Sequence, residues 1–261
     1  MNYLKPLKKF GQNYLTDINT IVKIAKTILP ENYDHIIEIG PGKGSLTREL
    51  LKQNDNITCF EIDTRVIEQL TAEFPTIKII NQDFLEINLK DFINPNEKTI
   101  ICGNIPYNIT SPIIFKLVHE YPLISDVVIM MQNEVAKRII AKPHTKEYGI
   151  LSVILGYFAD IEYCFKIPPT VFYPRPKIDS AILKISFRRN LNSKTDNKLF
   201  VQVVKAAFNN RRKTLKNSLS NSIFAHQDIF NSEFDFTRRA EELSINDFIL
   251  LTDIIKSKYK E

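Results

Sequence analysis

Three glycines at alternating positions form the segment that is best suited to bind a ligand. Gly40, Gly42 and Gly44 lie in the run Glu38-Ile-Gly-Pro-Gly-Lys-Gly44, directly after a short apolar stretch. Glycines at such a point let the backbone approach a ligand closely and adopt unusual dihedral angles. A dinucleotide loop would read G-x-G-x-x-G and would hold a pyrophosphate. The spacing here is G-x-G-x-G, and an acidic residue opens the run, which favours a positively charged cofactor.

Two further acidic residues stand where a nucleoside can be held. Glu61 ends the second apolar run, 19 residues after Gly42, and a carboxylate there can accept both ribose hydroxyls. Asp83 follows the third run and can accept a hydrogen bond from an adenine amine, with Phe84 packing nearby. A surface or helix-capping role is equally consistent with each acid taken alone. Together with the glycine run, and without a phosphate binder, they predict a site for S-adenosylmethionine.

The run Gly103-Asn-Ile-Pro-Tyr107 carries groups suited to a reaction on adenine's exocyclic amine. This nitrogen is a poor nucleophile because its lone pair is delocalised into the ring. The amide oxygen of Asn104 and the carbonyl of Ile105 or Pro106 can accept the two amine hydrogens, which frees the lone pair. Tyr107 can stack on the base. S-adenosylmethionine is already activated, so positioning carries most of the rate, and no general base is required because the proton can leave to water after transfer. The alternative interpretation is an ordinary turn between a strand and a helix.

These candidate residues fall at the ends of short apolar runs that alternate with helical patterns. The expected strands are residues 35–39, 57–61, 77–80, 99–102 and 126–131, and the expected helices are residues 46–53, 64–73, 111–120 and 133–140. Repeated strand–helix units predict a mostly parallel α/β sheet with helices on both faces. Such sheets bind ligands at the carboxyl ends of their strands. Residues 161–167 and 180–187 are expected to be late strands that pair antiparallel at an edge.

The composition changes after the last expected strand. Polar residues 190–196 predict a linker, and residues 198–220 and 237–258 show the periodicity of helices. The last 75 residues hold 14 basic and 9 acidic residues, which leaves 21 of each sign in the first 186. This excess of positive charge favours a polyanionic partner. We therefore expect a catalytic domain at residues 1–188 and a small helical domain at residues 189–261.

Composition also argues against several classes of protein. No stretch approaches the roughly 18–20 apolar residues of a membrane span, so no membrane partner is expected. The cysteines at positions 59, 102 and 164 are odd in number and widely spaced, which argues against a disulfide framework or a zinc site. No metal is expected. Reduced cysteines and the lack of an apolar leader segment fit a cytoplasmic protein.

Motifs along most of the chain resemble those of the KsgA-type small-subunit ribosomal RNA adenine N6,N6-dimethyltransferases. Besides the two runs above, the resemblance rests on residues 9–15, 132–136, 148–153, 172–180 and 208–215, in that order. It implies a Rossmann-like methyltransferase sheet of seven strands with a small all-helical C-terminal domain. It also implies transfer of two methyl groups from S-adenosylmethionine to each of two adjacent adenosines in the 3′-terminal hairpin loop of 16S rRNA, with S-adenosylhomocysteine as the product.

The resemblance further implies roles for individual residues and a partner. The implied cofactor site comprises Asn13, Leu15, Gly40, Gly42, Glu61, Asp83 and Asn104. The implied catalytic residues are Asn104, Pro106 and Tyr107, which hold the target base, and Phe172, which stacks on its other face. The implied RNA contacts are Arg188, Arg189, Arg211, Arg212, Lys213 and Lys216, the last four within two turns of one helix. The implied partner is 16S rRNA within the immature 30S subunit, bound by a monomer.

Other functions remain open at this point. An Erm-type methyltransferase acts on large-subunit rRNA and shares the cofactor and base motifs. The run Asn-Arg-Arg-Lys-Thr-Leu at residues 210–215 and the run Gln-Asn-Glu-Val at residues 132–135 favour the small-subunit enzyme. A mitochondrial relative with a second role in transcription is a further alternative. So are a nonenzymatic assembly factor that binds pre-ribosomes and, more remotely, an NAD-dependent dehydrogenase.

Overall fold

The computed structural model describes residues 6–7, 11–29, 32–189, 191, 195–225, 229–230 and 233–258. The chain divides into two compact units. The first comprises Met1–Ala136 and Ile161–Phe187, and the second comprises Lys137–Asp160 and Arg188–Glu261. The contacts thus group a stretch from the middle of the chain with the C-terminal residues. The domain boundary that we place after residue 188 follows composition and charge rather than contacts, and it stays a prediction.

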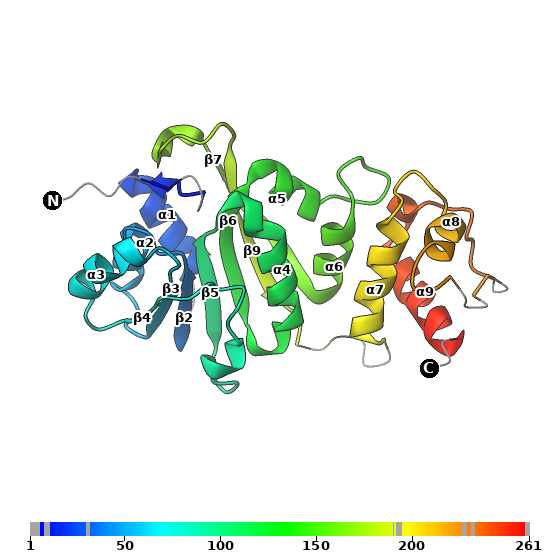
Figure 1. Cartoon of the computed structure of the whole chain (residues 1–261), viewed down its shortest axis with the longest axis horizontal. Coiled ribbons are helices and arrows are strands. Elements are labelled where there is room, and N and C mark those ends of the chain that lie inside the picture. Colours follow the sequence, from blue (N-terminus) through cyan, green and yellow to red (C-terminus); the bar gives the residue numbers. More distant parts are fainter. Residues whose placement is uncertain are drawn as a thin grey trace. The chain divides into compact units, whose positions relative to one another are not determined.

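A seven-stranded sheet forms the centre of the first unit (Figure 1). Its strand order is β4-β3-β2-β5-β6-β9-β7. The strands are β2 (His35–Ile39), β3 (Ile57–Phe60), β4 (Lys78–Ile80), β5 (Thr99–Asn104), β6 (Asp126–Gln132), β7 (Ala159–Ile167) and β9 (Ser180–Phe187). The pairs from β4 to β6 are parallel, and β9 runs antiparallel to β6. The expected fold class, a mostly parallel α/β sheet of seven strands, is confirmed.

Helices of the first unit cover the sheet through apolar side chains. They are α1 (Ile18–Ile28), α2 (Ser45–Leu50), α3 (Thr64–Glu73), α4 (Thr110–His119) and α5 (Asn133–Ile139), whose last residues reach the second unit. Ile28 of α1, Leu50 of α2 and Leu70 of α3 share one buried cluster with Cys59 and Cys102 of the sheet. Alternate strand residues point to the opposite face and are buried as well. Burial on both faces explains why these strands read as continuous apolar runs.

The crossover at the middle of the sheet defines where a ligand can bind. β2 and β5 are neighbours, and the chain runs outward through β3 and β4 on one side and through β6 on the other. Loops that leave the carboxyl ends of β2 and β5 therefore diverge and leave a crevice between them. The glycine run follows β2, and Asn104 ends β5. The topology thus brings the two sequence motifs to the same edge of the sheet.

A tight backbone contact between the two central strands leads to a stability prediction. Gly103 lies opposite Ile39, and a Cβ atom on Gly103 would come within 2.3 Å of the Ile39 carbonyl oxygen. By contrast, a Cβ atom on Gly40 would meet nothing within 4 Å, although its φ of +66° strains any other residue. Gly103→Ala should therefore lower the free energy of unfolding by about 3 kcal/mol or more, and Gly40→Ala by about 1–2 kcal/mol. Urea unfolding followed by circular dichroism measures the unfolding free energy of both variants. Equal losses in the two variants would contradict a tight contact at Gly103.

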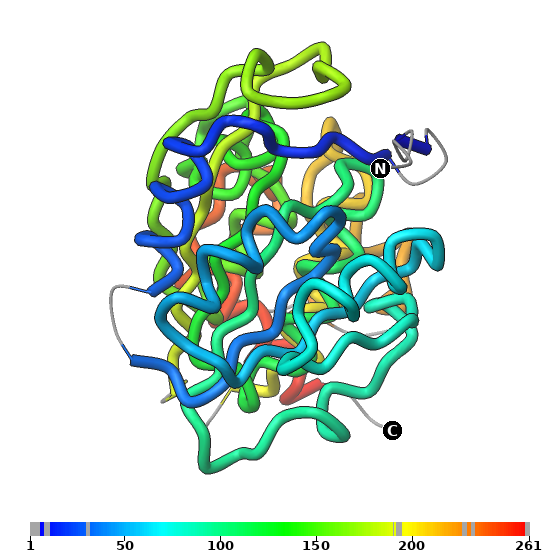
Figure 2. The backbone as a smooth tube through the Cα atoms, turned by 90° about the vertical axis from the view of Figure 1, so that its left-hand side faces the viewer, coloured from blue at the N-terminus to red at the C-terminus, as the bar shows by residue number. Residues whose placement is uncertain are grey.

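A two-stranded sheet ties the N-terminal region to a later part of the first unit. β1 (Tyr14–Leu15) pairs antiparallel with β8 (Phe172–Tyr173), with Leu15 opposite Phe172. The backbone N–H of Thr16 donates to the carbonyl of Val171 at 2.9 Å, which extends the pairing. Figure 2 shows the blue N-terminal segment beside the yellow-green stretch that contains β8. Sequence reasoning predicted neither this pairing nor α1.

The second unit is mainly helical, as expected for the C-terminal part. Its helices are α6 (Ile150–Phe158), α7 (Asn197–Phe208), α8 (Leu215–Ser220) and α9 (Ile245–Lys258). Aromatic rings join them: Tyr157 of α6 stacks on Phe200 of α7 at 4.1 Å, and Phe208 of α7 stacks on Phe248 of α9 at 5.9 Å. These contacts form an apolar centre for the second unit.

Two helices expected in the C-terminal region are wrong in extent. Residues 198–220 form two helices, because α7 ends at Phe208 and Thr214 starts α8 by accepting a hydrogen bond from the N–H of Asn217. Residues 237–258 are α-helical only from Ile245, where Ser244 and Asp247 cap the helix start through mutual hydrogen bonds. Local caps therefore override the apolar periodicity that suggested longer helices.

Two further expectations, the linker at residues 190–196 and the absence of a membrane span, can be compared with the structure. Asp196, the last residue of the predicted linker, caps α7 by accepting from the N–H of Leu199 at 3.0 Å. Residues 190 and 192–194 of that linker lie outside the described residues. Across the described ranges, no helix has both the length and the apolar character needed to cross a membrane.

Candidate active site

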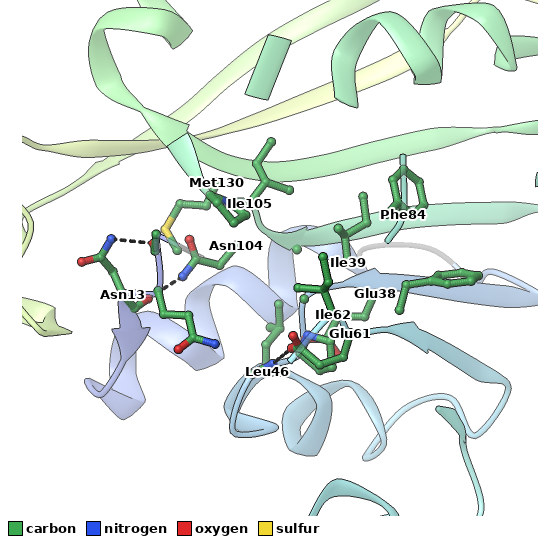
Figure 3. A pocket seen from close by; sticks show the side chains of 18 of the residues that line it. Asn13, Glu38, Ile39, Leu46, Glu61, Ile62, Phe84, Asn104, Ile105 and Met130 are labelled. Atoms are coloured by element: carbon green, nitrogen blue, oxygen red, sulfur yellow. Dashed lines mark hydrogen bonds between the residues drawn. The ribbon is translucent and has the colours of Figure 1, made fainter. Parts of the chain in front are cut away.

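A cavity of about 370 Å³ opens where the strands of the first unit end. It is lined by residues that follow β2, β3, β4 and β5 and by residues 11–15 of the N-terminal region. Of the predicted cofactor and catalytic residues, the cavity is lined by Asn13, Leu15, Gly40, Gly42, Glu61, Asp83, Asn104, Pro106 and Tyr107. Figure 3 shows side chains from both motifs around this space. The structure thus brings together nine residues that are spread over almost a hundred positions.

Glu61 is held in place by the backbone on both sides of the cavity edge. One carboxylate oxygen accepts from the N–H of Gly42 at 3.0 Å, and the other accepts from the N–H of Asp63 at 2.9 Å. The side chain is buried, and burial raises the pKa of its carboxyl above the ordinary value. Each oxygen keeps a further lone pair, so a fixed carboxylate can accept two vicinal hydroxyls of a ribose. The open space beside Gly40 leaves room for that sugar.

Glu38, the acid that opens the glycine run, is fully enclosed beneath the cavity. Its carboxylate accepts from the Thr47 hydroxyl at 2.6 Å, and the Cys59 thiol lies 3.8 Å from the same oxygen. Burial raises the pKa of Glu38 to about 7, because the charged form loses its hydration. A cation placed in the cavity would favour the ionised form. The residue therefore fits a positively charged cofactor.

The pKa of Glu38 predicts how stability depends on pH. In an unfolded chain the pKa of the carboxyl returns to its ordinary value of 4.5, whereas burial holds it at about 7 in the folded protein. The protonated form therefore stabilises the fold fully below pH 4.5, and this contribution is lost as pH rises through 7. Relative to Glu38→Gln, the wild type should lose about 2–3 kcal/mol of unfolding free energy between about pH 5 and pH 8. Urea unfolding at several pH values measures this, and a difference that does not change with pH would contradict it.

The far end of the cavity is walled by apolar and acidic groups. Phe84 is buried and packs edge-to-face on Phe60, with ring centroids 5.8 Å apart. Asp83 lines the cavity and accepts from the N–H of Leu85 at 2.8 Å, which fixes the orientation of its carboxylate. Ile62 also lines the cavity and is 46% exposed, unusual for an isoleucine. Flat apolar walls with one acceptor suit a planar base that carries an amine.

Asn104 is oriented by the backbone of the N-terminal region. Its amide nitrogen donates to the carbonyl of Asn13 at 2.8 Å, a contact drawn as a dashed line in Figure 3. With the nitrogen so engaged, the amide oxygen is the group left to accept a hydrogen from an amine in the cavity. Tyr107 is fixed as well, because its hydroxyl lies 2.7 Å from the Ser180 hydroxyl. The two side chains expected to hold the base are therefore both restrained.

The geometry favours one of the two carbonyls that the sequence left open as the second acceptor. The Pro106 carbonyl already accepts from the N–H of Ile109 at 3.2 Å and from the Thr110 hydroxyl at 3.4 Å. A carbonyl oxygen has two lone pairs, so both are in use. The carbonyl of Ile105 lies one residue nearer to Asn104 and is the better candidate. Whether Pro106 contacts the base stays a prediction.

Phe172 does not line the cavity with the other predicted catalytic residues. It is only 5% exposed and belongs to the apolar cluster beneath the sheet, beside Leu15, its partner in the β1–β8 pair. Burial of an aromatic ring is favourable, so the side chain packs inward rather than toward a base. Stacking on a substrate would require Phe172 to leave this cluster. The neighbouring Tyr173 is 49% exposed.

The predicted RNA-binding residues fall into two groups in the second unit. In the first group Arg188 pairs with Asp160 at 2.5 Å, and Arg211 pairs with Glu241 at 3.0 Å, so these two guanidiniums are engaged within the unit. The second group comprises Arg189, Arg212, Lys213 and Lys216, and all six residues are exposed. The expectation that residues 211–216 share one helix is wrong, because α7 ends before them and α8 begins within them. They lie instead on a turn and on the first residues of a short helix.

The sequence reasoning missed residues that line the cavity without belonging to a recognised role. Gln12, Asn108 and Met130 are among them. Gln12 and Asn108 stand next to predicted residues, so proximity to a motif was the available signal. Nothing in the sequence distinguishes Met130 from other apolar strand residues. Among the described residues there is no group of three or more His, Cys, Asp or Glu side chains that could hold a metal ion.

Comparison with known proteins identifies relatives over nearly the whole chain. The family model for ribosomal RNA adenine dimethylase matches residues 4–257. The chain is 43% identical over 257 residues to the ribosomal RNA small subunit methyltransferase A of Francisella tularensis subsp. novicida (strain U112), covering 96% of this chain and 98% of that protein. A dimethyladenosine transferase from Plasmodium falciparum has a similar structure, with a TM-score of 0.76, 24% identity and coverage of 94% and 98% of the two chains. The 23S rRNA methyltransferase ErmE gives a TM-score of 0.65 at 26% identity, with coverage of 94% and 100%.

Proposed function

Because the chain belongs to the ribosomal RNA adenine dimethylase family, we propose that it dimethylates the N6 amines of two adjacent adenosines in the 3′-terminal hairpin loop of 16S rRNA. S-adenosylmethionine is the methyl donor. The orientation of Asn104 toward the cavity by the Asn13 carbonyl is the observation that carries the reaction type. The choice of small-subunit rRNA is supported by 43% identity, over nearly the full length of both chains, to a protein named as a small-subunit methyltransferase.

The cavity residues fit this cofactor part by part. Glu61 is placed to accept the ribose hydroxyls, and the glycine run gives the amino acid portion close access to the backbone. Asp83 and Phe84 are placed at the adenine end. When bound, S-adenosylmethionine supplies a methyl group on a positively charged sulfur, which is already activated for transfer. Burial raises the pKa of Glu38 to about 7, and the positive charge of the cofactor would favour the ionised form of this carboxyl beneath it.

The segment Gly103–Tyr107, here called the catalytic loop, then acts on the target amine by holding it. The amide oxygen of Asn104 and the carbonyl of Ile105 accept the two amine hydrogens and draw the nitrogen toward tetrahedral geometry. Tyr107 stacks on the base, and its bond to Ser180 keeps the ring at one angle. The target adenosine must leave its stack to reach this site, which costs least in an RNA loop. Holding the reactants in line supplies the rate, and the amine proton leaves to water after transfer.

The exposed basic residues of the second unit are proposed to bind the RNA backbone. Arg212, Lys213 and Lys216 form no ion pair with any residue that the structure describes. Such cations contact phosphates without reading sequence, so they would add affinity rather than base choice. Arg188 and Arg211 contribute less to RNA binding, because their guanidiniums are engaged within the protein. We further propose that the enzyme acts as a cytoplasmic monomer on the immature 30S subunit.

Methylation of two substrates tests this function. Purified 30S particles and protein-free 23S rRNA are each incubated with the enzyme and methyl-labelled S-adenosylmethionine. Dimethyladenosine in the 3′-terminal fragment of 16S rRNA, identified by mass spectrometry, is the expected result. Methylation of 23S rRNA alone would establish an Erm-type activity instead. Binding to 30S particles without any methyl transfer would establish an assembly factor.

A further inference from the structure

We infer that Gln12 is a positioning residue, which links the ribose-binding edge of the cavity to the amide that holds the target base. It does so through residues 11–15, here called the strap. The inference deepens the proposed function and rests on it, because it assumes that Asn104 accepts a hydrogen from the substrate amine. Gln12 itself is not expected to touch the reacting atoms.

Gly11 and Asn13 of the strap contact the catalytic loop. The main-chain carbonyl of Asn13 accepts from the amide nitrogen of Asn104 at 2.8 Å. A Cβ atom on Gly11 would lie 3.4 Å from Cβ of Pro106 and 3.3 Å from the amide oxygen of Asn108, so the strap backbone runs directly beside this loop. The contact to Asn104 uses a main-chain atom. Its position therefore depends on what holds the strap backbone, not on the side chain of Asn13.

Gln12, which lies between these two residues, ties the strap to the cofactor side. The amide nitrogen of Gln12 donates to a carboxylate oxygen of Asp63 at 2.8 Å, and its amide oxygen accepts from the N–H of Leu7 at 2.8 Å. The N–H of Asp63 in turn donates to Glu61 at 2.9 Å. Two hydrogen bonds thus lead from the ribose-binding carboxylate of Glu61 to Gln12, the residue next to Asn13.

Asp63 is a firm anchor for this connection. It is 1% exposed, caps the start of α3, and pairs with the guanidinium of Arg65 at 2.5 Å. Hydrogen bonds from Arg65 and Gln12 lower the pKa of Asp63 to about 2, so the bond from Gln12 ends on an ionised acceptor. Hydrogen bonds to a charged group are stronger than those between neutral groups. The side chain of Asn13, by contrast, donates only to the carbonyl of Gly11 within the strap.

Cofactor binding and alignment of the target base therefore both depend on the strap, which the bond from Gln12 to Asp63 holds in place. Without Gln12 the strap keeps its β1 pairing after residue 14 but loses its side-chain tie to α3. The Asn13 carbonyl can then shift, and the amide of Asn104 loses its fixed orientation. A misplacement of about 1 Å at a reacting group can cost roughly 10²-fold in rate. We therefore expect Gln12 to affect the transfer step more than cofactor affinity.

The first experiment separates these two effects. Single-turnover methylation is measured with excess enzyme and saturating S-adenosylmethionine, and affinity for S-adenosylhomocysteine is measured by calorimetry. Gln12→Ala should slow transfer by about 10- to 100-fold and weaken S-adenosylhomocysteine by less than about threefold. Gln69→Ala, on the exposed face of α3, is the matched control and should leave both unchanged. An affinity loss equal to the rate loss would overturn the inference.

A second variant and a double mutant complete the test. Gln12→Met keeps the side-chain length without its hydrogen bonds, and it replaces the alanine variant if the latter unfolds. Asn104→Asp removes the donor to the Asn13 carbonyl, so adding Gln12→Ala to it should slow transfer little further. Rate losses that multiply would show that Gln12 acts independently of Asn104 and would overturn the inference. All rates are taken on whichever rRNA the wild type methylates, so a wrong substrate assignment cannot be mistaken for failure here.

Discussion

Asn104→Ala is expected to slow methyl transfer by about 10²- to 10³-fold, the cost of removing one well-placed hydrogen-bonding group from an active site. The amide oxygen is the acceptor that draws the amine nitrogen out of conjugation, and alanine offers none. Affinity for S-adenosylhomocysteine should fall by about tenfold at most, the value of a single neutral hydrogen bond. Single-turnover methylation of 30S particles and calorimetry with S-adenosylhomocysteine measure the two quantities.

Two further variants sharpen the result for Asn104. Asn104→Asp keeps an acceptor but loses the bond to the Asn13 carbonyl, so its rate should lie between those of the wild type and Asn104→Ala. Asn96→Ala removes an exposed asparagine on a surface turn and should leave rate and affinity unchanged. A rate for Asn104→Ala within a few-fold of the wild type would show that the base is held by other groups.

Glu61→Ala is expected to weaken S-adenosylhomocysteine binding by about 10²- to 10³-fold, because it removes two hydrogen bonds to a charged acceptor. It also strips the N–H groups of Gly42 and Asp63 of their acceptor, so the glycine run loses a support. Binding to 30S particles should stay near the wild-type level, since the proposed phosphate contacts lie in the second unit. Calorimetry and filter binding measure the two affinities.

Variants at neighbouring acids complete the Glu61 experiment. Glu61→Gln keeps one acceptor oxygen and should give an intermediate affinity. Glu68→Ala removes an exposed acid from α3 and should behave like the wild type. An equal loss of affinity for 30S particles in Glu61→Ala would contradict the separation of a cofactor-binding edge from a basic RNA-binding surface.

Local sequence determined most of the central sheet. The expected strands at residues 35–39 and 180–187 and the expected helix at residues 64–73 have the bounds that the structure shows. Strands buried on both faces read as short β-branched runs, and their lengths are limited by glycines and acids at their ends. The same local signals placed Glu61 and Asn104 at strand ends. The strand-end positions of Glu61 and Asn104 therefore follow from local sequence, whereas Asn13 and Leu15 were named only through the family resemblance.

Long-range contacts decided what the sequence could not. The pairing of Tyr14 with Tyr173 joins segments 159 positions apart, and no local pattern encodes such a partner. Phe172 was assigned to the substrate from its motif, yet burial beneath the sheet governs its packing. Thr214, which caps the start of α8 locally, is also held by a backbone bridge to Arg239. Each of these features is stabilised by a partner distant in the chain.

The two motifs from which the function was inferred show the same contrast between what the sequence determines and what the tertiary structure determines. Residue types alone determined that Glu38–Gly44 suits a cationic nucleoside cofactor and that Gly103–Tyr107 suits a planar amine. Only the tertiary structure showed that the Asn13 carbonyl orients Asn104 and that Gln12 ties this segment to Asp63. The reason is physical: chemistry follows from the atoms that a side chain carries, whereas its orientation depends on which backbone and side-chain groups the fold brings beside it.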